Sequence, residues 1–372
     1  AGSSGIVAFN NSNGSVTVNE SADTSVTGFK YGIQATANNR GVVGNNNSVT
    51  GAGSASGDVT INLSQNVHIQ ATGTANGTYG IFAENFNNLE GNITVNMAAG
   101  DTITSGGAGI NAYDGATQLP SGTILVNAEG TIHFGSALNG TGGQPAGILA
   151  GYLGNANGIT PSAGTFPFAG LNGNVIINSA ADITAAVGDG IRGYTYGATG
   201  DITINASAGT IIAQAQTNNA TSGNTTNGNG DGISAQNNGG GSIHVTTAAG
   251  VSITAGGSGV AANNGDNGNA AAVNGEISLV IFGTIESGTN AGILTGSGNL
   301  TAGILAGYNA TSSTAATPNV HGNVVIDDHA TITADVGDGV RGYNFGTGDV
   351  TITVENDSSV HGARYGVAAY TY

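Results

Sequence analysis

Residues 182–204 read DITAAVGDGIRGYTYGATGDITI and contain three short segments in which apolar and polar residues alternate. These segments are Asp182–Ala185, Gly190–Tyr194 and Gly200–Ile204. Alternation over four or five positions predicts a β-strand with one buried face. Glycine between the segments supplies the positive φ that sharp corners need. The stretch therefore predicts three short strands joined by tight corners.

The middle segment belongs to a tetrapeptide, Gly-Ile/Val-x-Ala/Gly, that recurs along the whole chain. It begins at Gly5, Gly32, Gly80, Gly109, Gly147, Gly190, Gly232, Gly259, Gly303, Gly339 and Gly366. The shortest spacing is 27 residues, and insertions of up to about 20 residues lengthen other units. Near Gly303, the sequence Gly292-Ile293-Leu294 offers an alternative starting point for the tetrapeptide of this repeat. A repeat of this length with variable insertions predicts a solenoid whose loops vary while its strands do not.

The other two segments recur in the same order after each tetrapeptide. The second usually opens with Gly-Asp or Gly-Asn, as at Gly57-Asp58 and Gly348-Asp349, and the third resembles Thr-Ile-x-Ala, as at Thr331–Ala334. Three strands per repeat predict an all-β fold, a right-handed parallel β-helix (β-solenoid) of about eleven coils. With about 4.8 Å between coils, the rod is on the order of 50 Å long. The branched residue of each tetrapeptide, such as Ile191, is expected to form one inner column.

A larger duplication is superimposed on the repeat. Gly147–Tyr152 recurs as Gly303–Tyr308, and Gly188–Tyr194 recurs as Gly337–Tyr343. The two copies cover about 147–212 and 303–362. We interpret 1–372 as a single β-helix domain that was lengthened by copying one block, which is typical of a spacer.

The composition excludes several classes of partner. The chain has 5 Lys and Arg residues against 22 Asp and Glu residues, and its net charge is −17. Nucleic acid and anionic membranes require clustered basic residues, so neither is an expected partner. The chain has no cysteine, and hence no disulfide framework or thiolate metal site. No apolar run approaches the length of a membrane span. We expect no cofactor, no resident metal and no direct membrane insertion.

The stacked units Gly-Asp-Gly-Ile/Val-x-Gly/Ala, Gly-Asp-Val/Ile-Thr-Ile and Thr-Ile-x-Ala resemble the passenger domains of bacterial autotransporters of type V secretion. The resemblance covers essentially the whole chain. It implies an extracellular location on the surface of a Gram-negative bacterium, export through a C-terminal β-barrel, and a role in adhesion or autoaggregation. The repeat already opens at Gly5 and no barrel is recognisable, so secretion signal and barrel are expected outside this fragment of a larger passenger.

An enzymatic alternative comes from polysaccharide-cleaving β-helices of the pectate lyase or polygalacturonase kind, which place carboxylates and a basic group on neighbouring coils. The densest candidate is Asp327-Asp328-His329, at the corner between a second and a third strand. No comparable carboxylate is expected one coil earlier, at Asn178–Ala180. We interpret the group as a corner and expect no catalysis. Asp189 and Asp231 are expected to stack on adjacent coils, where they either share a cation or occupy a corner that suits Asp.

The tyrosines provide the candidate binding face. All eleven lie within six residues of a tetrapeptide glycine, and alternation sends several of them outward. The predicted contact residues are Tyr113, Arg192, Tyr194, Arg341, Tyr343 and Tyr370. Either these side chains cover the sheet or meet a longer loop, or they form a stripe that binds glycan, extracellular matrix or another copy of the chain. Full retention of adhesion without Tyr194 and Tyr343 would place the contact in the inserted loops, such as 153–172 or 214–230. The sequence thus predicts a non-catalytic adhesin or structural rod on the cell surface.

Overall fold

The computed structural model describes residues 4–10, 14–37, 57–73, 77–85, 91–115, 122–135, 145–152, 172–197, 199–214, 230–265, 273–289, 301–309 and 319–372. Within these ranges the chain forms 31 strands arranged in three parallel sheets, here called A, B and C. Every third strand in the chain belongs to the same sheet, so the polypeptide visits A, B and C in turn and then repeats. The fold is the right-handed parallel β-helix that the repeat predicts.

Sheet A contains β1 (Ser4–Asn10), β4 (Tyr31–Ala37), β7 (Tyr79–Asn85), β10 (Ala108–Asp114), β13 (Ala146–Tyr152), β16 (Asp189–Thr195), β19 (Ile233–Asn237), β22 (Val260–Asn264), β25 (Ala302–Tyr308), β28 (Asp338–Asn344) and β31 (Tyr365–Thr371). Sheet B contains β2 (Val16–Glu20), β5 (Val59–Leu63), β8 (Ile93–Met97), β11 (Thr123–Ala128), β14 (Asn174–Ser179), β17 (Ile202–Ala206), β20 (Ile243–Thr247), β23 (Ile277–Ile281), β26 (Val324–Asp328) and β29 (Val350–Val354). Sheet C contains β3 (Ser25–Gly28), β6 (His68–Ala71), β9 (Thr102–Ser105), β12 (Thr131–Phe134), β15 (Asp182–Ala185), β18 (Gly209–Ala213), β21 (Val251–Ala255), β24 (Thr284–Ser287), β27 (Thr331–Ala334) and β30 (Ser359–Gly362).

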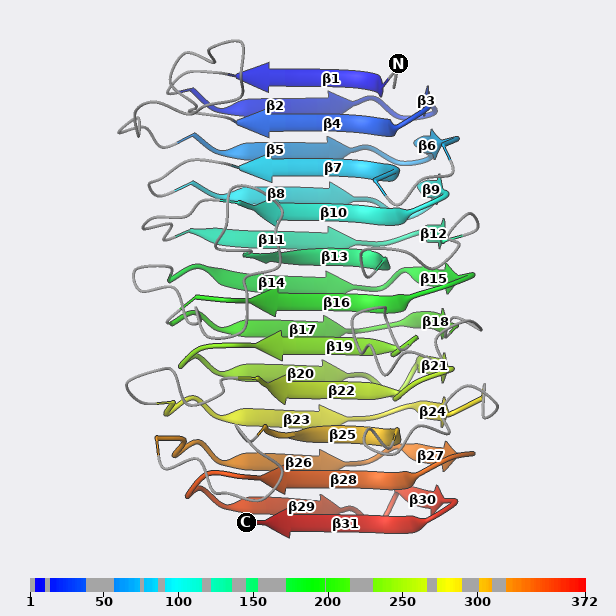
Figure 1. Ribbon diagram of the computed structural model, residues 1–372. Coiled ribbons are helices and arrows are strands. Elements are labelled where there is room, and N and C mark those ends of the chain that lie inside the picture. The colour runs from blue at the N-terminus through cyan, green and yellow to red at the C-terminus, as the bar shows by residue number, and fades with distance from the viewer. Residues whose placement is uncertain are drawn as a thin grey trace.

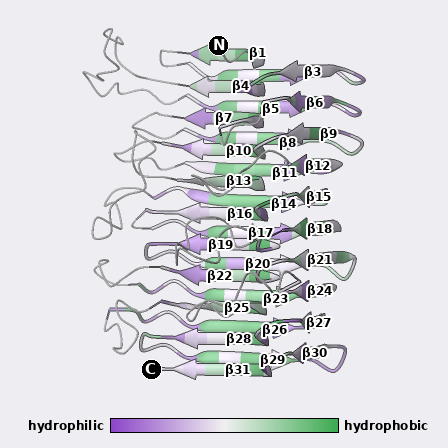
Figure 2. Ribbon diagram, turned by 45° about the vertical axis from the view of Figure 1, so that its right-hand side comes forward, coloured by the Kyte–Doolittle hydropathy of each residue, from purple (hydrophilic) through white to green (hydrophobic). Residues whose placement is uncertain are grey.

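The coils stack into a straight prism, and the two termini lie at its opposite ends (Figure 1). We number the coils from coil 1 (β1–β3) to coil 10 (β28–β30), and β31 begins an eleventh. Apolar residues run through the strands, whereas the arrowhead ends of many sheet A strands are hydrophilic (Figure 2). The described residues include no helix long and apolar enough to cross a membrane.

The inner column of sheet A has the register that the tetrapeptide predicts. Each branched residue pairs with the one in the next coil, in the order Ile6, Ile33, Ile81, Ile110, Ile148, Ile191, Ile233, Val260, Ile304, Val340 and Val367. The pairing of Ile304 with Val260 settles the uncertain register at Gly303, and the alternative starting point at 292–294 lies outside the described residues. From Ile33 to Val340 these side chains are fully buried. Each contributes roughly 1.5–3 kcal/mol relative to exposure.

The tetrapeptide glycine is required by a contact at the vertex between sheets C and A. A Cβ on Gly190 would overlap the Cγ2 atom of Ile211 and would lie 2.5 Å from the carbonyl oxygen of Gly232. The same overlap between an added Cβ and a branched side chain of sheet C recurs in every coil, from Gly5 with Val26 to Gly339 with Val360. A glycine column in sheet A thus makes room for an isoleucine and valine column in sheet C.

The Gly-Asp and Gly-Asn openings of the second strands have a separate cause at the corner between sheets A and B. Gly200 has a φ of 125°, and a Cβ there would meet the carbonyl oxygen of Gly173 in the coil before. The carboxylate of Asp201 accepts the backbone N–H of Ser242 in the next coil, at 2.7 Å. An inward asparagine completes the corner, because Asn237 donates to the carbonyl oxygen of Gly200 at 3.0 Å. The polar residue at the end of this sheet A strand therefore donates a hydrogen bond to a carbonyl group of the corner.

Replacing Gly190 with alanine tests the vertex contact. Because the new methyl group overlaps Ile211, we expect a loss of about 1–3 kcal/mol in the free energy of unfolding. Gly250 provides a matched control, since a Cβ at that position has nothing within 4 Å. Denaturant unfolding followed by circular dichroism should show Gly190→Ala destabilised and Gly250→Ala close to the parent. Equal stability of the two variants would remove the vertex as the reason for the glycine column.

Candidate contact face

The predicted contact residues lie on the outer side of sheet A, but their rings are covered. Tyr113, Tyr194 and Tyr343 are only 8%, 7% and 8% exposed. Arg192 and Arg341 retain partial exposure, at 12% and 21% of their side chains, and Tyr370 is also partly exposed. Alternation correctly predicts the outward direction of these side chains. It does not predict their burial, so three of the six residues do not present the open aromatic stripe that the sequence suggests.

Two of these rings lie over glycines of the preceding coil. A Cβ on Gly151 would lie 2.6 Å from Cδ1 of Tyr194, and a Cβ on Gly307 would lie 2.6 Å from Cδ1 of Tyr343. Both pairs are register partners in neighbouring strands of sheet A. The missing side chain at each glycine leaves the space that the ring fills. Both copies of the duplicated block keep this glycine–tyrosine pair, which explains why the copies match so closely here.

The hydroxyl group of Tyr343 extends the contact to a third coil. Its oxygen lies 2.6 Å from Oδ1 of Asn263 and 2.7 Å from Oδ1 of Asn309, which belong to coils 8 and 9. A hydroxyl group has one hydrogen, so it donates to one of these oxygens at a time. Burial raises the pKa of Tyr343, which therefore stays protonated and able to donate. The ring and hydroxyl group together link coils 8, 9 and 10.

A separate aromatic cluster covers sheet A near the N-terminal end of the rod. Tyr31, Tyr79 and Phe82 stack with ring centroids 5.0–5.8 Å apart, and Tyr113 belongs to the same cluster. The ammonium group of Lys30 lies 4.8 Å from the centroid of the Tyr31 ring. Such stacking contributes to stability beyond area burial. These contacts favour the interpretation in which the rings cover the sheet.

Asp189 and Asp231 lie on adjacent coils, as predicted, and both are buried. Asp189 accepts the backbone N–H of Asp231 at 3.0 Å, and Asp231 accepts that of Ser258 at 2.7 Å. Arg192 lies 3.4 Å from the Asp189 carboxylate and donates to Gln236 at 3.0 Å. Within the described residues, no group of three or more His, Asp or Glu side chains is placed to hold a metal ion. The observed role of these two carboxylates is to cap the strand starts of the following coils.

The burial of two carboxyl groups beside one arginine changes their protonation. Burial raises the pKa of Asp189, although Arg192 opposes the shift. Burial and the neighbouring charge of Asp189 raise the pKa of Asp231 to about 7. The second copy of the block differs, because Asp338 is paired with the guanidinium group of Arg364, with Nε at 2.7 Å from Oδ1. Of the two copies, only the first stacks two acids.

This acid pair makes stability depend on pH. The folded pKa of Asp231 lies above its unfolded value of about 3.9, so the stabilisation is complete below about pH 4 and is lost as the pH rises to 7. Asp231→Asn keeps the acceptor for Ser258 but removes the charge. We expect this variant to melt a few degrees above the parent at pH 7.5, with the difference shrinking toward pH 4.

Thermal melts of both proteins between pH 4 and pH 8 measure the effect. Asp338→Asn serves as the contrasting variant, since it removes the partner of Arg364 and should lower stability at pH 7.5. If the melting temperatures of the parent and Asp231→Asn differed by the same amount at every pH, the raised pKa of Asp231 would be contradicted.

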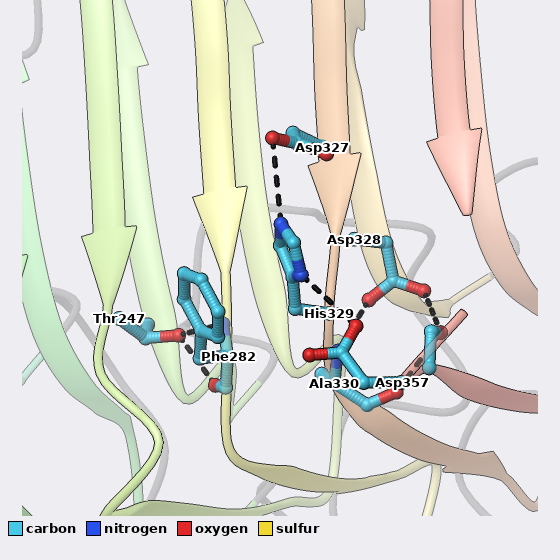
Figure 3. A network of polar contacts seen from close by, with 8 residues as sticks. Thr247, Phe282, Asp327, Asp328, His329, Ala330 and Asp357 are labelled. Atoms are coloured by element: carbon cyan, nitrogen blue, oxygen red, sulfur yellow. Dashed lines mark hydrogen bonds and ion pairs between the residues drawn. The ribbon is translucent and has the colours of Figure 1, made fainter. Parts of the chain in front are cut away.

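The Asp327-Asp328-His329 corner is a network of polar contacts (Figure 3). Asp328 is buried, where it accepts the backbone N–H of Ala330 at 3.0 Å and the hydroxyl of Ser358 at 2.6 Å. His329 lies between Asp327, 3.5 Å from Nε2, and Asp357, 3.0 Å from Nδ1. The serine therefore bonds to Asp328 and not to the histidine, so no hydroxyl–imidazole pair forms here.

Three successive coils contribute to this corner. The coil before it supplies Phe282, whose ring stacks on His329 with centroids 4.2 Å apart, and the coil after it supplies Asp357. The prediction that Asn178–Ala180 lies one coil before this corner is wrong, because Asp327 pairs with Val280. Desolvation lowers the pKa of His329, but the hydrogen bond and charge of Asp357 and the charge of Asp327 outweigh it and raise the pKa.

Sequence reasoning missed an asparagine column on the outside of sheet B. Its members are Asn19, Asn62, Asn96, Asn127, Asn178 and Asn205, one from each of coils 1–6. All six are at least partly exposed. The signal was present in the sequence, since each asparagine follows a buried Ile or Val at the same position of the second strand. The column emerges only when the second strands are aligned with one another.

In comparisons with known protein families, curated proteins and solved structures, no match to this chain was found.

Replacing Tyr343 separates its structural role from a binding role. Tyr343→Phe loses the hydroxyl contacts to Asn263 and Asn309 and should cost about 1 kcal/mol. Tyr343→Ser also loses the buried ring over Gly307 and should cost about 3–5 kcal/mol. Denaturant unfolding measures both. If Tyr343→Ser were as stable as the parent, the ring of Tyr343 would not be packed against sheet A. It would then again be a candidate for contact with a binding partner.

Proposed function

We propose that this chain is the passenger segment of a bacterial surface protein, a stiff and non-catalytic rod that holds adhesive surfaces away from the cell. The observation that carries the proposal is the unbroken stacking of the three strand columns from coil 1 to coil 10. Because each coil buries its branched residues only against its neighbours, the length of such a rod can grow without changing its cross-section. The duplicated block is what this mode of growth produces.

The resemblance of the Gly-Asp-Gly-Ile/Val units to autotransporter passengers supports an extracellular location. The weakly charged, cysteine-free composition is compatible with export as an unfolded chain. Expected partners are glycan, extracellular matrix or another copy of the rod. The covered rings of Tyr194 and Tyr343 favour adhesion through other surfaces of the prism. The inserted segments at 153–172 and 214–230 lie almost entirely outside the described residues.

The geometry of the acidic corner supports the non-catalytic part of the proposal. General acid–base cleavage of a sugar chain needs carboxyl groups that face one bond from two sides. Asp328 instead turns into the coil to bond Ala330 and Ser358, while Asp327 and Asp357 flank the two nitrogens of His329. This arrangement holds three coils together.

Beads coated with the folded chain test the proposal. They should attach to at least one of three surfaces, namely host-cell layers, matrix films or beads carrying the same chain, and should release no sugars from pectin. A matched control is Ile191→Asp, which places an unpaired charge in the inner column and should lose strand structure by circular dichroism. If the beads attached to none of the three surfaces, or if they released unsaturated or reducing sugars from pectin, the proposal would be overturned.

A further inference from the structure

The outer side of sheet B carries a ladder of hydrogen-bonded amides. The Nδ2 group of each asparagine donates to Oδ1 of the asparagine in the preceding coil, from Asn205 down to Asn19, at 2.8–2.9 Å. Five such bonds join six coils, so the amide planes have a fixed orientation along the rod. A rigid array loses little side-chain freedom when a ligand binds.

The ladder keeps unused hydrogen-bonding capacity. An amide has two N–H donors and an oxygen with two lone pairs. The ladder bonds use one donor and one lone pair of each central asparagine, such as Asn96 and Asn127. At least one donor and one lone pair therefore remain in each of coils 1–6, and they repeat at about 4.8 Å.

A second polar column lies beside the ladder, two residues earlier on the same strands. It contains Thr17, Thr60 and Thr94 in coils 1–3 and Thr203 in coil 6, with Leu125 and Ile176 between them. None of the residues in these two columns of coils 1–6 is ionisable. The face thus offers a continuous row of neutral amides beside a row of threonine hydroxyl groups that two apolar residues interrupt in coils 4 and 5.

The side of this face next to sheet C is bordered only by short connections. Every link from sheet B to sheet C contains two to four residues and lies within the described part of the chain. The longer connections join sheet A to sheet B or sheet C to sheet A (Figure 1). Each asparagine of the ladder lies one residue before the end of its strand, and hence beside the short corner.

We propose that the asparagine and threonine columns of coils 1–6 bind an uncharged, extended polysaccharide that lies along the rod axis. The inference rests on the proposed adhesive function and names its ligand class and its site. An anionic polymer would find no cation in these columns, and a protein partner would find no Trp, Tyr or Arg anchor of the kind that dominates protein interfaces. A neutral sugar chain matches the face, because each unit presents hydroxyl groups that both donate and accept hydrogen bonds. Many weak contacts in register then add through multivalency.

Cello-oligosaccharides are suitable probes, since they are neutral, linear and extended. Calorimetry with the whole folded chain should show cellohexaose binding much more tightly than cellobiose, while hexagalacturonic acid of the same length binds weakly. Absence of detectable cellohexaose binding would overturn the inference, as would equal or tighter binding of the anionic oligomer.

The double variant Asn96→Val, Asn127→Val locates the site. Valine already occupies this column at Val280, so the fold accepts it there. The control is Thr246→Val, Thr353→Val, which makes the same kind of change in the same column outside the ladder. We expect the ladder variant to lose at least about tenfold in affinity and the control to stay within about twofold. Equal affinities of the two variants would overturn the assignment.

A further variant keeps the inference testable if the ladder variant does not fold. Thr60→Val, Thr94→Val leaves every amide bond of the ladder in place and should still weaken cellohexaose binding severalfold; unchanged affinity would overturn the assignment. The bead assay separates this inference from the proposed function. If the beads attach but cellohexaose does not bind, the polysaccharide site is wrong and the adhesive rod stands; if both fail, the adhesive function is wrong as well.

Discussion

The contact between the glycine of sheet A and the branched residue of sheet C is the constraint on which the rest of the prism depends. In every coil from Gly5 with Val26 to Gly339 with Val360, a side chain at the glycine would overlap its partner. The chain must therefore return to this vertex once per coil, whatever it does elsewhere. Insertions at the two corners that border sheet A leave the contact intact, which is why the spacing between repeats varies while the strands do not. The short B-to-C corner contains no long insertion within the described residues.

Branched residues fill the inside of the prism in every coil, whereas the outer faces differ from one another. On sheet A, large rings fill the space over glycines, so outward residues such as Tyr194 are as buried as core residues. On sheet B, the amides of Asn62 and its neighbours bond along the rod and remain partly exposed. The difference follows from side-chain shape: a ring can lie flat across a neighbouring coil that has glycine, whereas the amides of the ladder bond to the next amide of the same column. The same backbone repeat thus supports a covered face and an open one.

The inner column was predictable from the sequence because alternation and a repeated glycine locate Ile191 and its partners without knowledge of the loops. The environment of Tyr194 was not, because alternation gives the direction of a side chain and says nothing of what covers it. The neighbours of Asp327 were also not predictable, since insertions of different length separate the coils. The duplicated copy at Asn178 was mistaken for the adjacent coil, which in fact contributes Val280. The asparagine ladder could have been found, because its members follow the same buried position in each second strand.

The acidic composition has a structural explanation in the same corners. Strands of a parallel stack begin with backbone N–H groups that need an acceptor from the neighbouring coil. Asp58, Asp182 and Asp201 each accept such an N–H, at 2.8, 2.8 and 2.7 Å. Lysine and arginine carry donors only, so they cannot serve at these positions. Repeating the corner through the rod therefore accumulates negative charge without reference to any partner. Because these carboxylates gather at the corners, the asparagine and threonine columns of sheet B can stay neutral in coils 1–6 while the chain as a whole carries a net charge of −17.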